Sequence, residues 1–208
     1  ERLQPLGVRG SAVVEEEHDA IDDGLPEVVT LASGNLGLIS FPRIPHRVTL
    51  EELEEHYPLV VPTLRDHPGV AFMLVRSREQ GPVAIGKVGT HYLESGRIDG
   101  EDPLEPFGPN AARKALRTDG FPHVADIMVN STYWDDMEEV AAFEELVGSH
   151  GGMGGPQQYP FLLAPSAFAM PDELLLGPGT VYRQLCRWLA DLGQDAYRAE
   201  ELAAPRTV

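Results

Sequence analysis

The sequence predicts an α/β or α+β domain, with a mixed sheet that contains a β meander and is flanked by helices. Two observations predict this class. Short apolar runs that are bounded by turn residues are typical of buried strands. An apolar stripe at helical spacing over residues 181–192 is typical of a packed helix that closes the domain. The chain of 208 residues, 42% hydrophobic and 24% charged, is long enough to bury a core between these elements.

The first elements follow an acidic lead-in. Residues 28–31 and 36–41 predict two strands, because the Ser-Gly-Asn between them is typical of a tight turn. Thr49 and Glu52 have the spacing of a capping box, in which the hydroxyl and the carboxylate satisfy the free N–H groups of a helix start. We therefore expect a helix to begin there, with a second short helical stretch at residues 63–66.

The middle of the chain contains the strongest strand signals. Residues 70–75 form a continuous apolar run that is too short for a helix, which predicts a strand buried on both faces. Turn residues after it predict a meander over residues 70–98 that includes a strand at 83–88. A short helix capped by Asn110 is expected to end near residue 117.

A second buried strand is predicted at residues 124–129, with a carboxylate inside it. A carboxylate in an apolar strand needs a partner, so we expect Asp126 to meet an arginine, backbone donors or a metal. Residues 137–147 are apolar at helical spacing and predict a helix that leads into a glycine-rich loop.

We divide the chain into a lead-in segment, residues 1–27, a single α/β domain, residues 28–193, and a polar tail, residues 194–208.

Charge and composition exclude several classes of function. The formal charge of −17, from 33 acidic and 16 basic residues, repels a phosphate backbone, so no nucleic-acid binding is expected. No apolar run approaches the length of a membrane span, so this chain by itself is expected to be soluble. The single cysteine, Cys186, excludes an internal disulfide and a cysteine-based zinc cluster, and it is expected to be a buried thiol.

The most informative stretch is the glycine-rich loop near residue 150. His150 stands at its edge and is followed by four glycines, Gly151, Gly152, Gly154 and Gly155. Glycines leave the backbone N–H groups bare, so such a loop can gather an imidazole and several donors around a metal or an anion. The alternative is a helix that ends in glycines, with His150 stabilising its C-terminus.

Three runs that include this loop, residues 32–41, 121–130 and 140–155, carry a resemblance to a known family. Together they resemble the C-terminal part of actinobacterial proteins of the alkaline phosphatase superfamily. These are similar to type I phosphodiesterases or nucleotide pyrophosphatases, often with an N-terminal membrane or holin-like region. The resemblance covers residues 28–165 and implies the C-terminal portion of an alkaline phosphatase-like fold.

The resemblance implies a metal-dependent phosphoryl-transfer hydrolase. In that superfamily two divalent ions, usually zinc, are held by aspartates and histidines, and a serine or threonine attacks the phosphate ester substrate. His150 matches the last metal ligand, which is followed by glycine. The nucleophile and the other ligands belong to segments upstream of this chain, so it contains no catalytic residue. We expect the four glycines to line the site and Asp126 and His123 to support the ligand.

The chain begins with Glu1 rather than Met, so we expect it to be a piece of a longer protein, inactive alone and without a tightly held metal. The resemblance allows that longer protein to be associated with a membrane. Two other interpretations stay open. One is a noncatalytic acidic module that binds a partner. The other is a complete small hydrolase that uses a serine with His150 and Asp126.

Overall fold

The computed structural model describes residues 24–144, 148–155, 158–194 and 197. The chain divides into two compact units, Glu1–Pro160 and Phe161–Val208. The sequence predicted instead a single domain over residues 28–193. Within the second unit, residues 161–177 form no helix or strand.

The first unit is built on a seven-stranded sheet with the order β1-β2-β7-β3-β4-β5-β6. Every pairing between these strands is antiparallel, so the structure has the α+β form of the predicted class and not a mixed sheet. Short connections explain this, because β3 to β6 follow one another as the predicted meander. The strands are β1 (Val29–Ser33), β2 (Leu36–Ser40), β3 (Val70–Ser77), β4 (Gly81–Gly86), β5 (Gly89–Tyr92), β6 (Arg97–Gly100) and β7 (Ile127–Ser131).

Four of the predicted helices form close to their expected bounds. They are α1 (Leu50–His56), α2 (Val60–Asp66) and α3 (Ala111–Asp119) in the first unit, and α4 (Pro178–Asp191) in the second. The 3-10 helix η1 (Glu105–Phe107) was not predicted. The capping box before α1 is confirmed. The Thr49 N–H donates to the Glu52 carboxylate at 2.8 Å, and the Glu52 N–H donates to the Thr49 hydroxyl at 3.4 Å. Asn110 stands at the start of α3, but its side chain makes no capping hydrogen bond.

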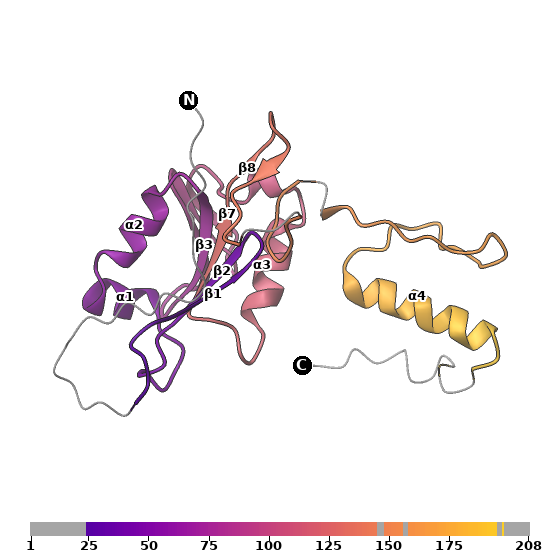
Figure 1. The fold of residues 1–208 in the computed structure, drawn as a ribbon, viewed down its shortest axis with the longest axis horizontal. Coiled ribbons are helices and arrows are strands. Elements are labelled where there is room, and N and C mark those ends of the chain that lie inside the picture. Colours follow the sequence, from indigo (N-terminus) through magenta and orange to yellow (C-terminus); the bar gives the residue numbers. More distant parts are fainter. Residues whose placement is uncertain (1–23, 145–147, 156–157, 195–196, 198–208) are drawn as a thin grey trace. The chain divides into compact units, whose positions relative to one another are not determined.

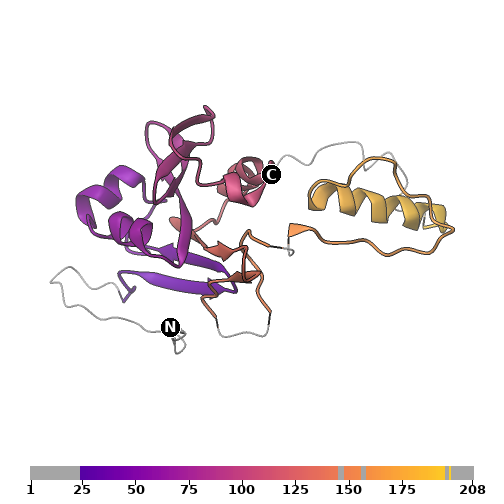
Figure 2. The same cartoon turned by 90° about the horizontal axis from the view of Figure 1, so that it is seen from above.

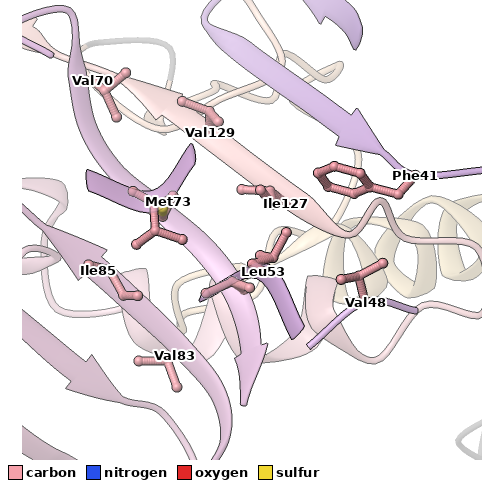
Figure 3. Packing of buried hydrophobic residues seen from close by; sticks show 11 residues of the cluster. Phe41, Val48, Leu53, Val70, Met73, Val83, Ile85, Ile127 and Val129 are labelled. Carbon is pink, nitrogen blue, oxygen red and sulfur yellow. The ribbon is translucent and has the colours of Figure 1, made fainter. Parts of the chain in front are cut away.

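Helices cover both faces of the sheet around β3 (Figure 1). α1 and α2 lie on one face, where Leu53 and Val61 pack against Met73 of β3. Figure 3 shows how the side chains of this cluster point toward one another. α3 lies on the other face, where Ala115 packs in one cluster with Leu74 of β3. Because neighbouring residues of a strand face opposite sides, the continuous apolar run of β3 is buried on both, as predicted.

The helix predicted at residues 137–147 is wrong for the residues that the structure describes there. Residues 137–144 contain no helix, and residues 145–147 lie outside the described residues. β9 (Glu139–Val140) pairs instead with β8 (Tyr133–Trp134). Tertiary contacts override the helical spacing, since the N–H of Phe143 donates to the Gly34 carbonyl at 2.7 Å.

In the second unit, α4 packs against the loop that precedes it. The ring of Trp188 contacts that of Phe168, with centroids 5.3 Å apart, and its indole N–H donates to the Ala169 carbonyl at 2.8 Å. The predicted apolar stripe is only partly correct. Leu185 and Leu192 are 42% and 61% exposed, and polar Gln184 is buried in their place. The amide of Gln184 reaches the same carbonyl at 3.2 Å, which accounts for its burial. Cys186 is a free, buried thiol, as predicted.

Candidate functional site

The glycine-rich loop is fixed to the turn between β1 and β2 by Asn35. This side chain is fully buried. Its amide oxygen accepts from the N–H of Gly152 at 2.9 Å, and its amide nitrogen donates to the Met153 carbonyl at 3.0 Å. Its own backbone N–H donates to the His150 carbonyl at 3.0 Å. Asn35 therefore fixes the loop on both sides of Gly151.

Asn130 fixes the same loop from the end of β7. It is 3% exposed, its amide oxygen accepts from the N–H of Met153 at 2.6 Å, and its amide nitrogen donates to the Met153 carbonyl at 2.9 Å. The N–H groups of Gly152 and Met153 thus donate to protein oxygens. The donors that a phosphate-binding loop would direct at an anion are, at these two positions, used to attach the loop to the sheet.

The glycines of the loop allow this close approach. A Cβ atom at Gly152 would lie 2.7 Å from both the Asn130 amide oxygen and the Asn35 carbonyl oxygen. Gly155, with φ of 63°, lies over Tyr133, where a Cβ atom would come within 2.7 Å of the ring. Burial, together with nearby carboxylates, raises the pKa of Tyr133 above its ordinary value. Side chains at Gly152 or Gly155 would push the loop off the sheet.

His150 is the residue that the loop leaves at the surface. Its side chain is exposed, and its Nδ1 atom lies 3.3 Å from the hydroxyl of Ser33, the last residue of β1. Within the described residues, no hydrogen-bond partner of Nε2 is present. When Nδ1–H donates to Ser33, Nε2 carries the lone pair. The helix-capping alternative is excluded for the described residues, because 137–144 and 148–150 form no helix.

Asp126 directly precedes β7, at the end of the strand opposite to Asn130, and does not lie inside the strand as predicted. Its two carboxylate oxygens accept from the N–H groups of Phe41 at 2.8 Å and Val48 at 2.7 Å. Of the three partners that the sequence left open, backbone donors are therefore the ones present. Four residues of strand, about 13 Å, separate Asp126 from Asn130 and the loop. The predicted alternative of a catalytic triad made of a serine, His150 and Asp126 is therefore wrong, because Asp126 and the loop that carries His150 lie at opposite ends of β7. His123 is exposed.

The sequence did not single out as a site the histidine–carboxylate pair of His91 and Asp102. Nδ1 of His91 lies 2.9 Å from a carboxylate oxygen of Asp102, and the same oxygen accepts from the N–H of Leu104. The pair lines an open pocket together with Glu105. In the described part of the chain, this pocket and the glycine-rich loop alike lack a group of three or more side chains that could hold a metal ion.

A comparison with protein-family models, with curated proteins and with solved structures found no match to this chain. Of the helices that the structure describes, none is long and apolar enough to cross a membrane.

Sequence reasoning missed the two asparagines that build the site. Asn35 stood in a predicted turn and Asn130 at the end of a predicted strand. An amide that ends an apolar strand was the available signal, since a polar side chain beside a buried strand needs partners.

Proposed function

We propose that this chain is the C-terminal part of a metal-dependent phosphodiesterase or phosphatase, to which it contributes His150 as one ligand of a divalent ion, in the intact protein one of two zinc ions. The observation that carries the proposal is the presentation of the imidazole. The loop is anchored by buried Asn35 and Asn130, and Nδ1 of His150 lies against the Ser33 hydroxyl. Metal-binding histidines characteristically use one ring nitrogen for such an orienting hydrogen bond and the other for the metal.

The described residues supply one proposed metal ligand, His150, and not the further ligands that a catalytic zinc needs. A catalytic zinc needs three protein ligands, and the described residues contain no group of three. The remaining ligands and the nucleophile are therefore assigned to a part of the protein outside these residues, and no hydrolytic step is assigned to this chain. In sites of this class the ions activate the nucleophile and neutralise charge on the phosphoryl oxygens.

The test compares two exposed histidines in the longer protein. His150→Ala should remove one ion from each molecule and lower hydrolysis of a chromogenic phosphodiester at least about 100-fold. His56→Ala, at the exposed end of α1, should leave metal content and turnover unchanged. Metal content is measured by mass spectrometry of the purified proteins. Full metal content and normal turnover in His150→Ala would contradict the proposal.

Ser33 gives a finer test, because it acts on the ligand and not on the metal. Ser33→Ala should weaken metal affinity by about 10-fold, while Ser33→Thr, which keeps the hydroxyl, should restore it. An unchanged affinity in Ser33→Ala would show that the hydrogen bond does not orient the imidazole.

The second candidate function is a noncatalytic module that binds a partner through its surface. The observation that favours it is that the N–H groups of Gly152 and Met153 already donate within the protein. The 208-residue chain alone should hydrolyse neither phosphodiester nor monoester with zinc, manganese or magnesium under either candidate. Turnover by the chain alone that is lost in His150→Ala would contradict both.

A further inference from the structure

The two edges of the seven-stranded sheet differ in charge. β6, at one edge, carries Arg97 and Asp99, whose side chains form an ion pair at 3.3 Å. β1, at the other edge, has the sequence Val-Thr-Leu-Ala-Ser and contains no charged residue. Charged side chains on an edge strand oppose pairing with another strand, whereas an uncharged apolar edge favours it. The β6 edge is therefore protected against pairing, and the β1 edge is not.

β1 is exposed where a further strand would bind. Thr30, Leu31 and Ala32 are all exposed, and within the described residues β1 pairs only with β2. Alternate residues of an antiparallel strand direct their main-chain groups to the same neighbour. Because Ser33 and Leu36 close the turn as a pair, Thr30 and Ala32 are the residues whose N–H and C=O groups face the free edge. Figure 2 shows the two-stranded ribbon of β1 and β2, in indigo, from above.

The sheet face beside this edge is apolar. Leu31 is 61% exposed and lies opposite Leu38, which in turn lies opposite Met128 of β7. Leu38 and Met128 are only partly buried. α3 covers this face at β3 and β4, and the described helices do not contact β1 or β2 to a comparable extent. An incoming strand would cover Leu31 and extend the apolar row across the sheet.

We propose that β1 pairs with a β-strand that belongs to the segment of the longer protein carrying the other metal ligands. This assignment rests on the proposed function. Ser33, the last residue of β1, contacts His150, so a strand paired along β1 would end beside that imidazole. The strand is neutral or basic and apolar at alternate positions, because it faces an uncharged edge on a strongly acidic chain. A second copy is disfavoured as the occupant, since each copy carries a formal charge of −17.

Amide hydrogen exchange, measured by mass spectrometry, tests the pairing directly. In the longer protein, the amides of Thr30 and Ala32, which face the free edge, should exchange at least about 100-fold more slowly than in the 208-residue chain alone. Residues 97–100, at the protected edge, should exchange equally in both. Rapid exchange of Thr30 and Ala32 in the longer protein would overturn the proposal.

Matched variants at the two edges sharpen the test. Leu31→Lys places a charge on β1, and Ile98→Lys places one at a similarly exposed position on β6, where Ile98 is 43% exposed. In the longer protein, Leu31→Lys should accelerate exchange at Thr30 and Ala32 to the rate of the isolated chain, and Ile98→Lys should not. Leu31→Val should keep the protection. Equal melting temperatures of the three variants in the isolated chain would show that the fold is unchanged.

The remaining outcomes identify another occupant or separate the two proposals. Slow exchange of Thr30 and Ala32 in the isolated chain would overturn the proposal. The occupant would then be a second copy if sedimentation velocity shows a dimer, and residues 1–23 if it shows a monomer. Protected β1 with normal metal content in His150→Ala would support the strand pairing and contradict its link to a metal site. Unprotected β1 with metal lost in His150→Ala would contradict only the strand pairing.

Discussion

The two ends of β7 are each fixed by one buried polar side chain, and they differ in what they hold. At the carboxylate end, Asp126 accepts hydrogen bonds from Phe41 and Val48, which lead from β2 into α1. At the amide end, Asn130 exchanges two hydrogen bonds with Met153 in the glycine-rich loop. The carboxylate end therefore connects segments of the core, and the amide end determines where a surface loop lies.

The chemistry of the two ends matches this difference. A carboxylate that accepts two buried N–H groups forms charge-assisted hydrogen bonds, which are among the stronger interactions in a core. An amide can donate and accept at once, so Asn130 can fix both main-chain groups of Met153 without introducing a charge beside His150. We therefore expect the stability of the core to depend mainly on the carboxylate end, and the position of the glycine-rich loop mainly on the amide end.

Removing the carboxylate should have the largest effect on stability. Asp126→Ala leaves the buried N–H groups of Phe41 and Val48 without acceptors, so we expect a loss of about 3–4 kcal/mol in the free energy of unfolding. Urea denaturation of the 208-residue chain measures it. The control is Asp66→Ala, an exposed carboxylate paired with Arg65, which should change stability by less than about 0.5 kcal/mol. Similar losses in both would contradict the importance of the carboxylate end.

A side chain at the amide end should cost less and act on the loop. Gly152→Ala places a Cβ atom 2.7 Å from the Asn130 and Asn35 oxygens, and we expect a loss of about 2 kcal/mol. Gly148→Ala is the matched control, because nothing lies within 4 Å of its Cβ position, and it should stay within about 1 kcal/mol of the wild type. Both are measured by urea denaturation, with hydrogen exchange of residues 148–155 as the local readout. If the two glycines tolerate alanine equally, the loop is not held as described.

The capping box next to the carboxylate end should make part of the stability depend on pH. Hydrogen bonds from the Thr49 backbone and from His46 lower the pKa of Glu52 from 4.5 to about 2 in the folded protein. A lowered pKa means that Glu52 stabilises the fold above pH 4.5 and that this contribution is lost as the pH falls toward 2. Glu52→Gln should cost about 1 kcal/mol at pH 7.

The measurement is urea denaturation of the wild type and of Glu52→Gln between pH 7 and pH 2. The difference between the two proteins should shrink across the window from pH 4.5 to 2. A difference that stays constant over this range would show that the charge of Glu52 is not what stabilises the start of α1.

Changing His150 itself should have the smallest effect on stability. The imidazole is exposed and makes one hydrogen bond, to Ser33, so His150→Ala should cost less than about 0.5 kcal/mol in the isolated chain. The same variant is expected to lose a metal ion in the longer protein. A stability loss as large as that of Gly152→Ala would mean that His150 holds the loop, and that the amide end does not act alone.

The elements along the chain were predictable wherever local signals agreed. Residues 70–75 became β3 because a short apolar run can bury both faces only as a strand. The capping box predicted the start of α1 because its two hydrogen bonds are local. The predicted helix at residues 137–147 failed where it is described, because the partners of Ala141 and Phe143 are the distant carbonyls of Thr132 and Gly34.

The site was predicted only in part. The sequence drew attention to His150 and its glycines, because that composition is unusual, and it indicated that Asp126 needs a partner. It did not show that Asp126 and the loop lie at opposite ends of one strand, nor that Asn35 and Asn130 hold the loop. Partners that are 118 and 23 residues away in the chain leave no local pattern.

The sequence by itself determined the local features of this protein: most strands of its main sheet and most of its helices, the acidic charge, the buried thiol of Cys186, and the glycine-rich loop that presents a histidine. Only the tertiary structure decided that the sheet is antiparallel, that backbone donors satisfy Asp126, and that β1 is an uncharged edge ending at His150. The physical reason is range. Turns, caps and apolar periodicity act within a few residues, whereas strand order and the partners of buried polar groups depend on contacts between residues far apart in the chain.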